Sequence, residues 1–356
     1  MYNPLKGRGF VMSLSPREVE VLSIIVESYI KTSSPIGSRY VAKKSKLNLS
    51  PASMRNIMAD LTEKGYLTQP HTSAGRIPTE KGFKFYISQI LKPKLPQKTK
   101  HKIKKFLFEV SVSSDIADLL ESTSKLISSQ ASQVGMVISP GIDNIRWKYI
   151  DFVLVKPGLV LVVMVFEGGM VQNKVLNVDK KITSEELIKY KNFLNDRFKG
   201  QTITEIKKKI IEEMEEAHTR FNELYYKALS LANRAFVNVK PEREIYLDGT
   251  LTVFEQIDKK DIESMKELLE FLEQRSKLLK LLDKISSSKD VIITFGGDLD
   301  KEKLKEWSII SSPYKVKGET LGLVGTIGPI NMDYSSIIPL VDYVAKMLSE
   351  ILEMRF

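Results

Sequence analysis

Hydrophobic residues near the N-terminus recur every three or four positions in three separate stretches, each bounded by signals that start or stop helices. Ser15-Pro16 has the residue types of a helix cap followed by a first helical residue, and the same pair occurs again at 50–51. A shorter helix is expected between them over residues 36–46, with Tyr40 and Val41 facing inward and Arg39, Lys43, Lys44 and Lys46 facing outward. The pattern therefore predicts three consecutive helices, the third of which ends at Gly65.

The third predicted helix, over residues 51–64, has a small and uncharged outward face near its start. At about 100° per residue its apolar residues form one stripe, whereas Ala52 and Asn56 lie opposite and Arg55 lies on the flank. Such a face fits the major groove of DNA, where arginine pairs with guanine and asparagine with adenine. An ordinary surface helix whose arginine forms a salt bridge has the same pattern, so this helix alone leaves both interpretations open.

After the third helix, the sequence takes on the composition of a β-hairpin followed by another helix. Residues 66–68 are a short β-rich run, residues 69–76 are polar and contain Gly and Pro, and Thr79 is placed to cap the next helix. Three helices followed by a hairpin predict a winged helix-turn-helix module over residues 13–91. Its predicted DNA-binding residues are Arg39, Ser50, Ser53, Arg55, Asn56, His71, Thr72, Ser73 and Arg76.

Positive charge is concentrated in the same part of the chain. The 356 residues carry a formal charge of +10, and residues 1–100 alone hold 17 Lys and Arg against 6 Asp and Glu. A basic excess on a folded module is typical of a protein that binds a polyanion, most often nucleic acid. The basic run at 92–105 is predicted to be a linker, which could lie along the DNA backbone.

The remainder of the chain changes from a β pattern to a helical pattern and back. Three β-rich runs between residues 147 and 178 predict an antiparallel meander, and helical periodicity follows until about residue 285. Strand composition then returns, and a final amphipathic helix is expected at 337–354. A sheet interrupted by helices predicts an inserted subdomain. The expected division is a sheet domain in two segments, 106–182 and 286–356, with a helical insertion at 183–285.

The predicted insertion carries more apolar surface than one local core requires. A single winged helix reads only a few base pairs, so two copies related by a two-fold axis are expected to read an inverted repeat. We therefore expect a homodimer held by the insertion through Phe221, Tyr225, Leu268, Leu269, Leu278 and Leu279.

Candidate catalytic and metal-binding residues are few. The absence of cysteine excludes disulfides, thiolate nucleophiles and cysteine-ligated metals. Glu215 and His218 match half of a di-iron motif, but the partners that such a site needs are missing, and a solvated helix face accounts for these residues. The glycines at 296–297 and between 318 and 328 fit no nucleotide-binding motif. No catalytic residue, metal or cofactor is expected, and the chain is predicted not to be an enzyme.

Four short runs in and after the third helix carry a resemblance to a known family: Met54 to Leu61, Gly65 to Leu67, Pro70 to Thr79 and Gly82 to Tyr86. They resemble the bacterial heat-inducible transcription repressor family, HrcA. The resemblance implies a dimeric repressor that binds an inverted-repeat operator of the CIRCE type upstream of chaperone operons, with activity supported by a GroEL-type chaperonin. It also implies a GAF-like domain with an inserted dimerisation domain. The family usually has an arginine where this chain has Asn331, so that arginine's role is not carried over.

The sequence thus predicts an α+β multidomain protein that represses transcription by binding double-stranded DNA. One alternative is a ligand-sensing winged-helix regulator that uses the GAF-like domain as a small-molecule pocket. A second is an enzyme with a nucleic-acid-binding arm, which no motif supports. The longest apolar run, 159–166, is about a third of the length that spans a bilayer, so a cytoplasmic protein without membrane contact is expected.

Overall fold

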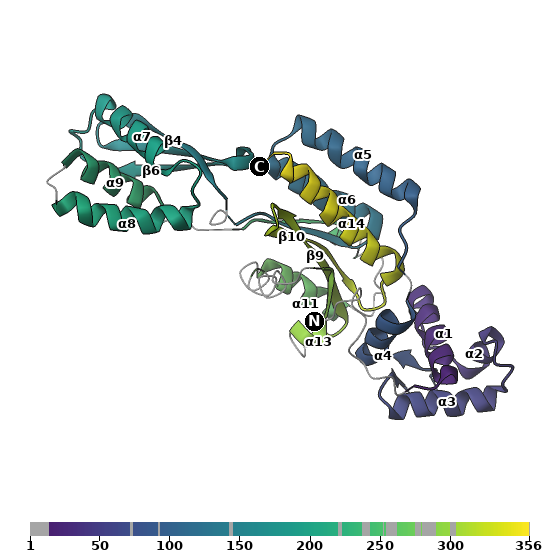
Figure 1. Ribbon diagram of the computed structural model, residues 1–356. Helices are drawn as coiled ribbons and strands as arrows, with labels where there is room; N and C mark the ends of the chain where they lie inside the picture. Colours follow the sequence, from purple (N-terminus) through teal and green to yellow (C-terminus); the bar gives the residue numbers. More distant parts are fainter. Residues whose placement is uncertain are drawn as a thin grey trace.

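The computed structural model describes residues 14–71, 74–91, 93–141, 145–219, 223–236, 243–251, 253, 262–274, 279, 290–299 and 304–355. Its helices and strands form a mixed α/β architecture, which confirms that part of the predicted fold class. Figure 1 shows three parts in a row: a helical N-terminal module, a sheet covered by helices in the middle, and a second sheet with helices of its own.

The N-terminal module begins with a capping box, as predicted. The Ser15 hydroxyl accepts the Glu18 N–H at 3.4 Å, and the Glu18 carboxylate accepts the Ser15 N–H at 2.7 Å. Apolar side chains from every helix then meet in one core, which includes the fully buried Leu22, Met54 and Phe83. The elements are α1 (Pro16–Thr32), α2 (Ser38–Lys44), α3 (Pro51–Glu63), β1 (Leu67–Thr68), β2 (Ile77–Pro78), α4 (Glu80–Phe85) and η1 (Tyr86–Ile90).

The middle part is a five-stranded antiparallel sheet with helices on both faces. Its strand order is β7-β3-β10-β9-β8, so strands far apart in sequence lie side by side. Side chains alternate along each strand, and the two faces have separate cores, one under α5, α6 and α14 and the other under α11. The strands are β3 (Val134–Ile138), β7 (Ile245–Asp248), β8 (Ile292–Phe295), β9 (Trp307–Val316) and β10 (Glu319–Pro329). The helices are α5 (Gln97–Ser113), α6 (Ile116–Ala131), α11 (Ile262–Glu273), α13 (Gly296–Leu299) and α14 (Tyr334–Glu353).

The third part is a three-stranded antiparallel sheet with one face covered by helices. Residues on that face are buried together with helix residues in a single core, in which the Trp147 and Phe198 rings lie 6.4 Å apart. The elements are β4 (Trp147–Lys156), β5 (Leu159–Phe166), η3 (Glu167–Gly169), β6 (Val171–Asn177), α7 (Ser184–Phe198), α8 (Ile203–Thr219) and α9 (Glu223–Phe236).

The structure differs from the predicted division at both ends of the insertion. The meander, expected in the segment 106–182, does not join the five-stranded sheet, because its apolar face is covered by the helices that follow it. Conversely, β7 and α11 were expected in the insertion at 183–285 but belong to the middle part. Strand β7 pairs with β3, and α11 packs against one face of the five-stranded sheet. The interruption of the sheet thus runs from the end of β3 to the start of β7, and it contains strands as well as helices.

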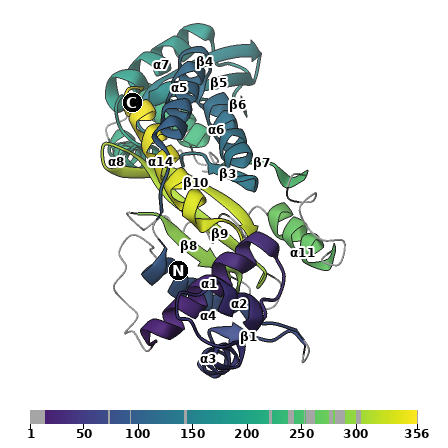
Figure 2. The same cartoon turned by 90° about the vertical axis from the view of Figure 1, so that its right-hand side faces the viewer.

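The basic run at 92–105 is also only partly a linker. Residues from Gln97 onward belong to α5, which buries Ile103 and Leu107 against the middle part. Both views place α5 towards the upper end of the molecule and α3 at its lower end (Figures 1 and 2). The lysines of α5 therefore lie away from α3 instead of extending its basic surface.

Candidate nucleic-acid interface

Helix α3 is the outermost element of the N-terminal module. Figure 1 places it along the lower edge of the molecule, with α1, α2 and α4 between it and the middle sheet. The stripe predicted to face the core is buried or half-buried, whereas Ala52, Arg55 and Asn56 are exposed. Within the described residues, the side chains of Arg55 and Asn56 have no hydrogen-bond or salt-bridge partner. These two side chains are therefore available to a ligand.

The start of α3 is held by two of the predicted DNA-binding residues. The Ser50 hydroxyl accepts the Ser53 N–H at 3.1 Å, and the two hydroxyl groups lie 3.0 Å apart in a second hydrogen bond. The acids of the helix, Asp60 and Glu63, are exposed in its second half. The helix thus presents its positive dipole end and its only arginine together, away from its own negative charges.

A short hairpin, formed by β1 and β2, follows α3. Leu67 pairs with Pro78 in a two-stranded antiparallel sheet, and Arg76 forms a further antiparallel bridge with Ile36 through N–H···O bonds of 2.9 Å in both directions. Gly75 makes this approach possible, because a Cβ at this position would overlap the Ile36 backbone. The returning strand is therefore fixed against the segment that precedes α2.

The tip of the hairpin contains three predicted DNA-binding residues. His71 is exposed, and its carbonyl accepts the Ala74 N–H at 2.9 Å in a turn. Gln69 supports that turn by donating from its amide to the Ala74 carbonyl at 2.9 Å. Thr72 and Ser73 lie outside the described residues, so their contact with DNA stays a prediction.

Arg76 differs from the other predicted contacts because the module itself uses part of its side chain. It is half-buried, and its Nε donates to the Thr62 hydroxyl at 3.1 Å. This bond ties the hairpin to the last turn of α3. Any contact of Arg76 with a phosphate would come from the remaining guanidinium N–H groups.

Helix α2 adds side chains that the prediction misplaced or left out. Arg39 is exposed, as expected, but Tyr40 is also 42 % exposed and does not face the core. Adjacent helical residues point about 100° apart, so Val41, which is fully buried, takes the inward position and Tyr40 cannot share it. Lys43 and Lys44 are exposed on the same helix and were recognised as outward, though not as site residues.

An ion pair joins the end of α3 to the start of α1. Lys64 Nζ, just after α3, lies 2.6 Å from the Glu18 carboxylate at the start of α1. Burial raises the pKa of Glu18, but hydrogen bonds from Lys64 and Ser15 outweigh burial and bring that pKa below its ordinary value of 4.5. The carboxylate therefore remains charged at neutral pH and holds α3 against α1.

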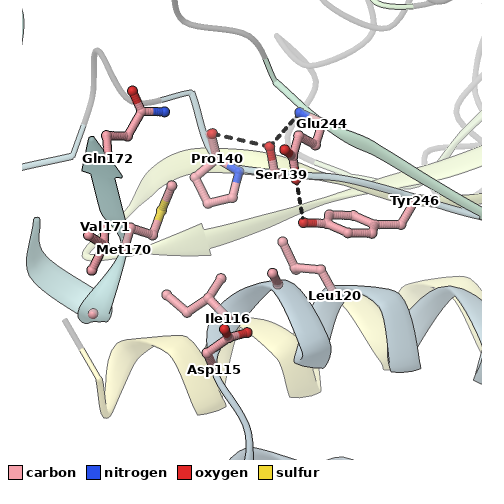
Figure 3. Close-up of a pocket in the computed structure, with 12 residues that line it drawn as sticks. Asp115, Ile116, Leu120, Ser139, Pro140, Met170, Val171, Gln172, Glu244 and Tyr246 are labelled. Carbon is pink, nitrogen blue, oxygen red and sulfur yellow. Dashed lines mark hydrogen bonds between the residues drawn. The ribbon is translucent and has the colours of Figure 1, made fainter. Parts of the chain in front are cut away.

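A separate cavity of about 300 Å³ lies between the middle part and the third part (Figure 3). Figure 3 shows Asp115 and Ile116 facing Glu244 and Tyr246 across it, with Met170 on a third side. The Tyr246 hydroxyl donates to the Glu244 carboxylate at 2.7 Å. The described lining residues include two carboxylates and no Lys, Arg or His, so a cation suits the cavity better than an anion.

Other candidate chemistry receives no support. Within the ranges that the structure describes, no three His, Asp or Glu side chains are grouped so as to hold a metal ion. The side chains of Glu215 and His218 lie outside the described residues. Of the helices described, none is long and apolar enough to cross a membrane.

A basic helical module on a larger α/β body, with a helix exposed for contact, is typical of a nucleic-acid-binding protein. Comparison with known proteins identifies the particular group. Residues 117–338 match the family model described as HrcA protein C terminal domain. The chain is 40 % identical over 349 residues to the heat-inducible transcription repressor HrcA of Nitratidesulfovibrio vulgaris strain Miyazaki F, covering 97 % of each chain. The chain therefore belongs to the HrcA family of heat-inducible transcription repressors.

Further matches agree with this assignment. The HrcA repressors of Syntrophobacter fumaroxidans and Geobacter sulfurreducens are each 36 % identical over 341 residues, which cover 96 % of this chain and 98 % of theirs. A crystal structure titled only as a hypothetical protein has a TM-score of 0.58 at 21 % identity, covers 96 % of this chain and 99 % of its own, and shares the fold. The family assignment confirms the resemblance and the prediction of a non-enzymatic repressor.

Proposed function

We propose that this chain represses chaperone operons by binding, as a homodimer, to an inverted-repeat operator of the CIRCE type. The observation that carries the proposal is the exposed start of α3, where Arg55 and Asn56 have no partner among the described residues. Membership in the HrcA family supports heat-inducible repression as the context. Because a repressor acts on DNA, we place the protein in the cytoplasm.

In this proposal, residues 13–91 act as a winged helix. Helix α3 enters the major groove, and Arg55 and Asn56 contact base edges. Arg39, the α2 lysines and the hairpin tip contact phosphates, which set the register of the module on the duplex. Ser50 and Ser53 support the start of α3, whose N–H groups and dipole favour a nearby phosphate.

Footprinting on the chain's own upstream genomic regions tests DNA binding and operator symmetry together. We expect protection of two half-sites related by a two-fold axis, one for each subunit. Protection of one continuous asymmetric site, or equal protection of unrelated DNA, would contradict the proposal.

We further propose that the second sheet supplies the dimer interface. On its uncovered face, Tyr149, Val165 and Val171 form one cross-strand row and Val153, Leu161 and Val175 form another, and the row between them consists of Asp151, Val163 and Asn173. Val171 and Val175 are 59 % and 56 % exposed. Exposed apolar rows on a sheet face are typical of a protein interface, and in a two-fold dimer the same rows of the second subunit would cover them.

This assignment moves the interface away from the helix residues named in the sequence prediction. Leu268 is fully buried against the five-stranded sheet, and Leu279 is half-buried on the same core, so neither is surplus. Phe221 and Leu278 lie outside the described residues, as does the side chain of Tyr225. The GAF-like domain of the proposal is the middle part, and the dimerising insertion is the third part.

A charge placed on the uncovered face tests the interface. We expect Val175→Glu to sediment as a monomer with an unchanged circular dichroism spectrum, because the two-fold axis brings like charges together. Ile188→Glu is the matched control, since Ile188 is also 56 % exposed but lies on α7. An undiminished Val175→Glu dimer would place the interface elsewhere.

The same face bears on the proposed chaperonin partner. In a separated subunit it is uncovered apolar surface, which is what a GroEL-type chaperonin binds. The Val175→Glu monomer should therefore displace an unfolded substrate from the chaperonin less effectively than a wild-type monomer does. Equal competition by both would remove this face from the interaction.

We also propose a second function, that the cavity binds a small organic cation. Its two carboxylates, apolar floor and position between two parts of the chain support this. In differential scanning fluorimetry, 1,4-diaminobutane should raise the melting temperature, and the uncharged 1,4-butanediol should not. The shift should disappear in Glu244→Gln and remain in Glu121→Gln, which removes a carboxylate of α6 that pairs with Lys125. Equal shifts in both variants would contradict this function.

A further inference from the structure

The core of the N-terminal module continues without a break into the middle part. Phe83 of α4 is fully buried, and its ring lies 6.0 Å from that of Tyr334, the first residue of α14. The Tyr334 ring lies in turn 6.2 Å from that of Phe295 at the end of β8. The module is therefore packed against the sheet, in addition to being joined to it by the chain.

Tyr334 is rigidly held from the side of the sheet. It is fully buried, and its hydroxyl donates to the Ile330 carbonyl at 2.8 Å and lies 2.9 Å from the Ser308 hydroxyl of β9. A buried ring with satisfied polar atoms has little freedom to move. The surface that it offers to Phe83 consequently has a fixed orientation relative to the sheet.

Charged groups surround this aromatic contact. Lys84 Nζ lies 2.5 Å from the carboxylate of Glu80 in its own helix and 3.2 Å from that of Asp298 in α13, and it sits over the Phe295 ring. Burial lowers the pKa of Lys84, but the two carboxylates outweigh burial and hold that pKa above its ordinary value. The ion pair between module and sheet is therefore present throughout the neutral pH range.

Contacts at two other places prevent the module from turning about this point. Asn331, before α14, donates from Nδ2 to the hydroxyl of Ser33, which caps the end of α1, at 2.7 Å. The connecting segment is also tied down, because the Lys94 N–H donates to the Ser335 carbonyl at 3.2 Å. Contacts on α4, at the end of α1 and on the connecting segment together determine the orientation of α3.

We propose that Asp298 and Asn331 are positioning residues that set the spacing between half-sites which the dimer accepts. The inference rests on the proposed dimeric binding to an inverted repeat. Two modules held rigidly on their sheets present their α3 helices at one separation and one angle. Inserting one base pair increases the distance between the half-sites by about 3.4 Å and also rotates one half-site relative to the other about the duplex axis. A rigid dimer therefore rejects the altered repeat. A dimer with loosely tethered modules would follow the altered repeat and accept it.

The test measures the affinity of the full-length protein for its footprinted operator, for operators with one base pair inserted or deleted between half-sites, and for a single half-site. We expect wild type to lose affinity on the order of tenfold per altered base pair, and Asp298→Ala with Asn331→Ala to lose about threefold or less. Half-site affinity should be equal in the two proteins. Asp342→Ala is the control, because Asp342 pairs with Lys346 within α14, outside the contact.

A covalent lock complements the weakened variant. The chain has no cysteine and the Ser33 and Asn331 side chains are in contact, so Ser33→Cys with Asn331→Cys introduces a single pair of thiols at this contact, and mass spectrometry under non-reducing conditions checks that they form a disulfide on oxidation. The oxidised protein should bind the native operator as tightly as wild type and retain its rejection of altered spacing. Rejection that survives in the double alanine variant, or loss of operator binding in the locked protein, would overturn the inference. Failure of wild type to bind the full operator would instead overturn the proposed function.

Discussion

Removal of the Arg55 side chain is the most direct test of α3 as the reading helix. In Arg55→Ala, folding should be almost unaffected, because the guanidinium is exposed and has no partner in the described structure. Surface substitutions of this kind change stability by about 0.5 kcal/mol or less. A bidentate contact to guanine is worth about 1 to 3 kcal/mol, so each half-site should lose that amount. A dimer contains two copies, and the full operator should lose about twice as much.

The assay is fluorescence anisotropy with labelled half-site and full operator, repeated with each base pair of the half-site changed in turn. Wild type should discriminate at one position where Arg55→Ala does not, and Asn56→Ala should lose discrimination at a different position. Lys102→Ala on α5 removes the same charge far from α3 and serves as the control. If both α3 variants keep the wild-type pattern of base preference with an unchanged melting temperature, α3 is not the reader.

Three further outcomes are expected. Arg76→Ala should weaken specific and non-specific DNA binding alike and reduce the slope of log affinity against log salt concentration by about one unit. It should also lower the melting temperature, because the bond to Thr62 is lost. An unchanged slope would exclude a phosphate contact. Gly75→Ala should destabilise the module by about 1 to 3 kcal/mol in urea unfolding, because the Ile36 backbone cannot move aside; wild-type stability would show that the hairpin adjusts. The pKa of Glu18 is lower in the folded state than its ordinary 4.5, so its stabilisation is present above that pH and lost as pH falls through the folded-state pKa. The melting temperature of wild type should therefore exceed that of Glu18→Gln at pH 7 and approach it in acid, and a constant difference would contradict this assignment.

Features that depend on a few neighbouring residues were predictable from the sequence. The capping residues Ser15, Ser50 and Thr79 each accept a backbone N–H three residues later, as expected. The apolar stripe of α3 and its exposed opposite face follow from helical periodicity alone. The antiparallel meander was also predicted, because alternation and turn residues lie within one short window. The error at Tyr40 came from including two adjacent residues in a single helical stripe.

Features that depend on distant partners were not predictable. Gly135 of β3 pairs with Asp248 of β7 across more than a hundred residues, and no local pattern indicates that pairing. The sequence pattern of the meander is compatible both with joining the five-stranded sheet and with forming a separate sheet. The helices α7, α8 and α9, which cover its apolar face, make it a separate sheet. In the sequence, Asn331 is notable only as a departure from the family. Its contact with Ser33 depends on the packing of the end of α1 against the segment before α14.

The sequence by itself determined the elements of the N-terminal module, the side of α3 that faces outward and the family of repressors to which the chain belongs. These follow from caps, periodicity and motifs, whose energies arise between residues a few positions apart. The tertiary structure alone decided which strands share a sheet, which apolar face is left uncovered, and how α3 is oriented relative to the sheet through Phe83, Tyr334 and Asp298. These depend on burial shared between distant segments, and hydrophobic burial is non-directional, so a sequence pattern shows that a surface must be covered without showing what covers it.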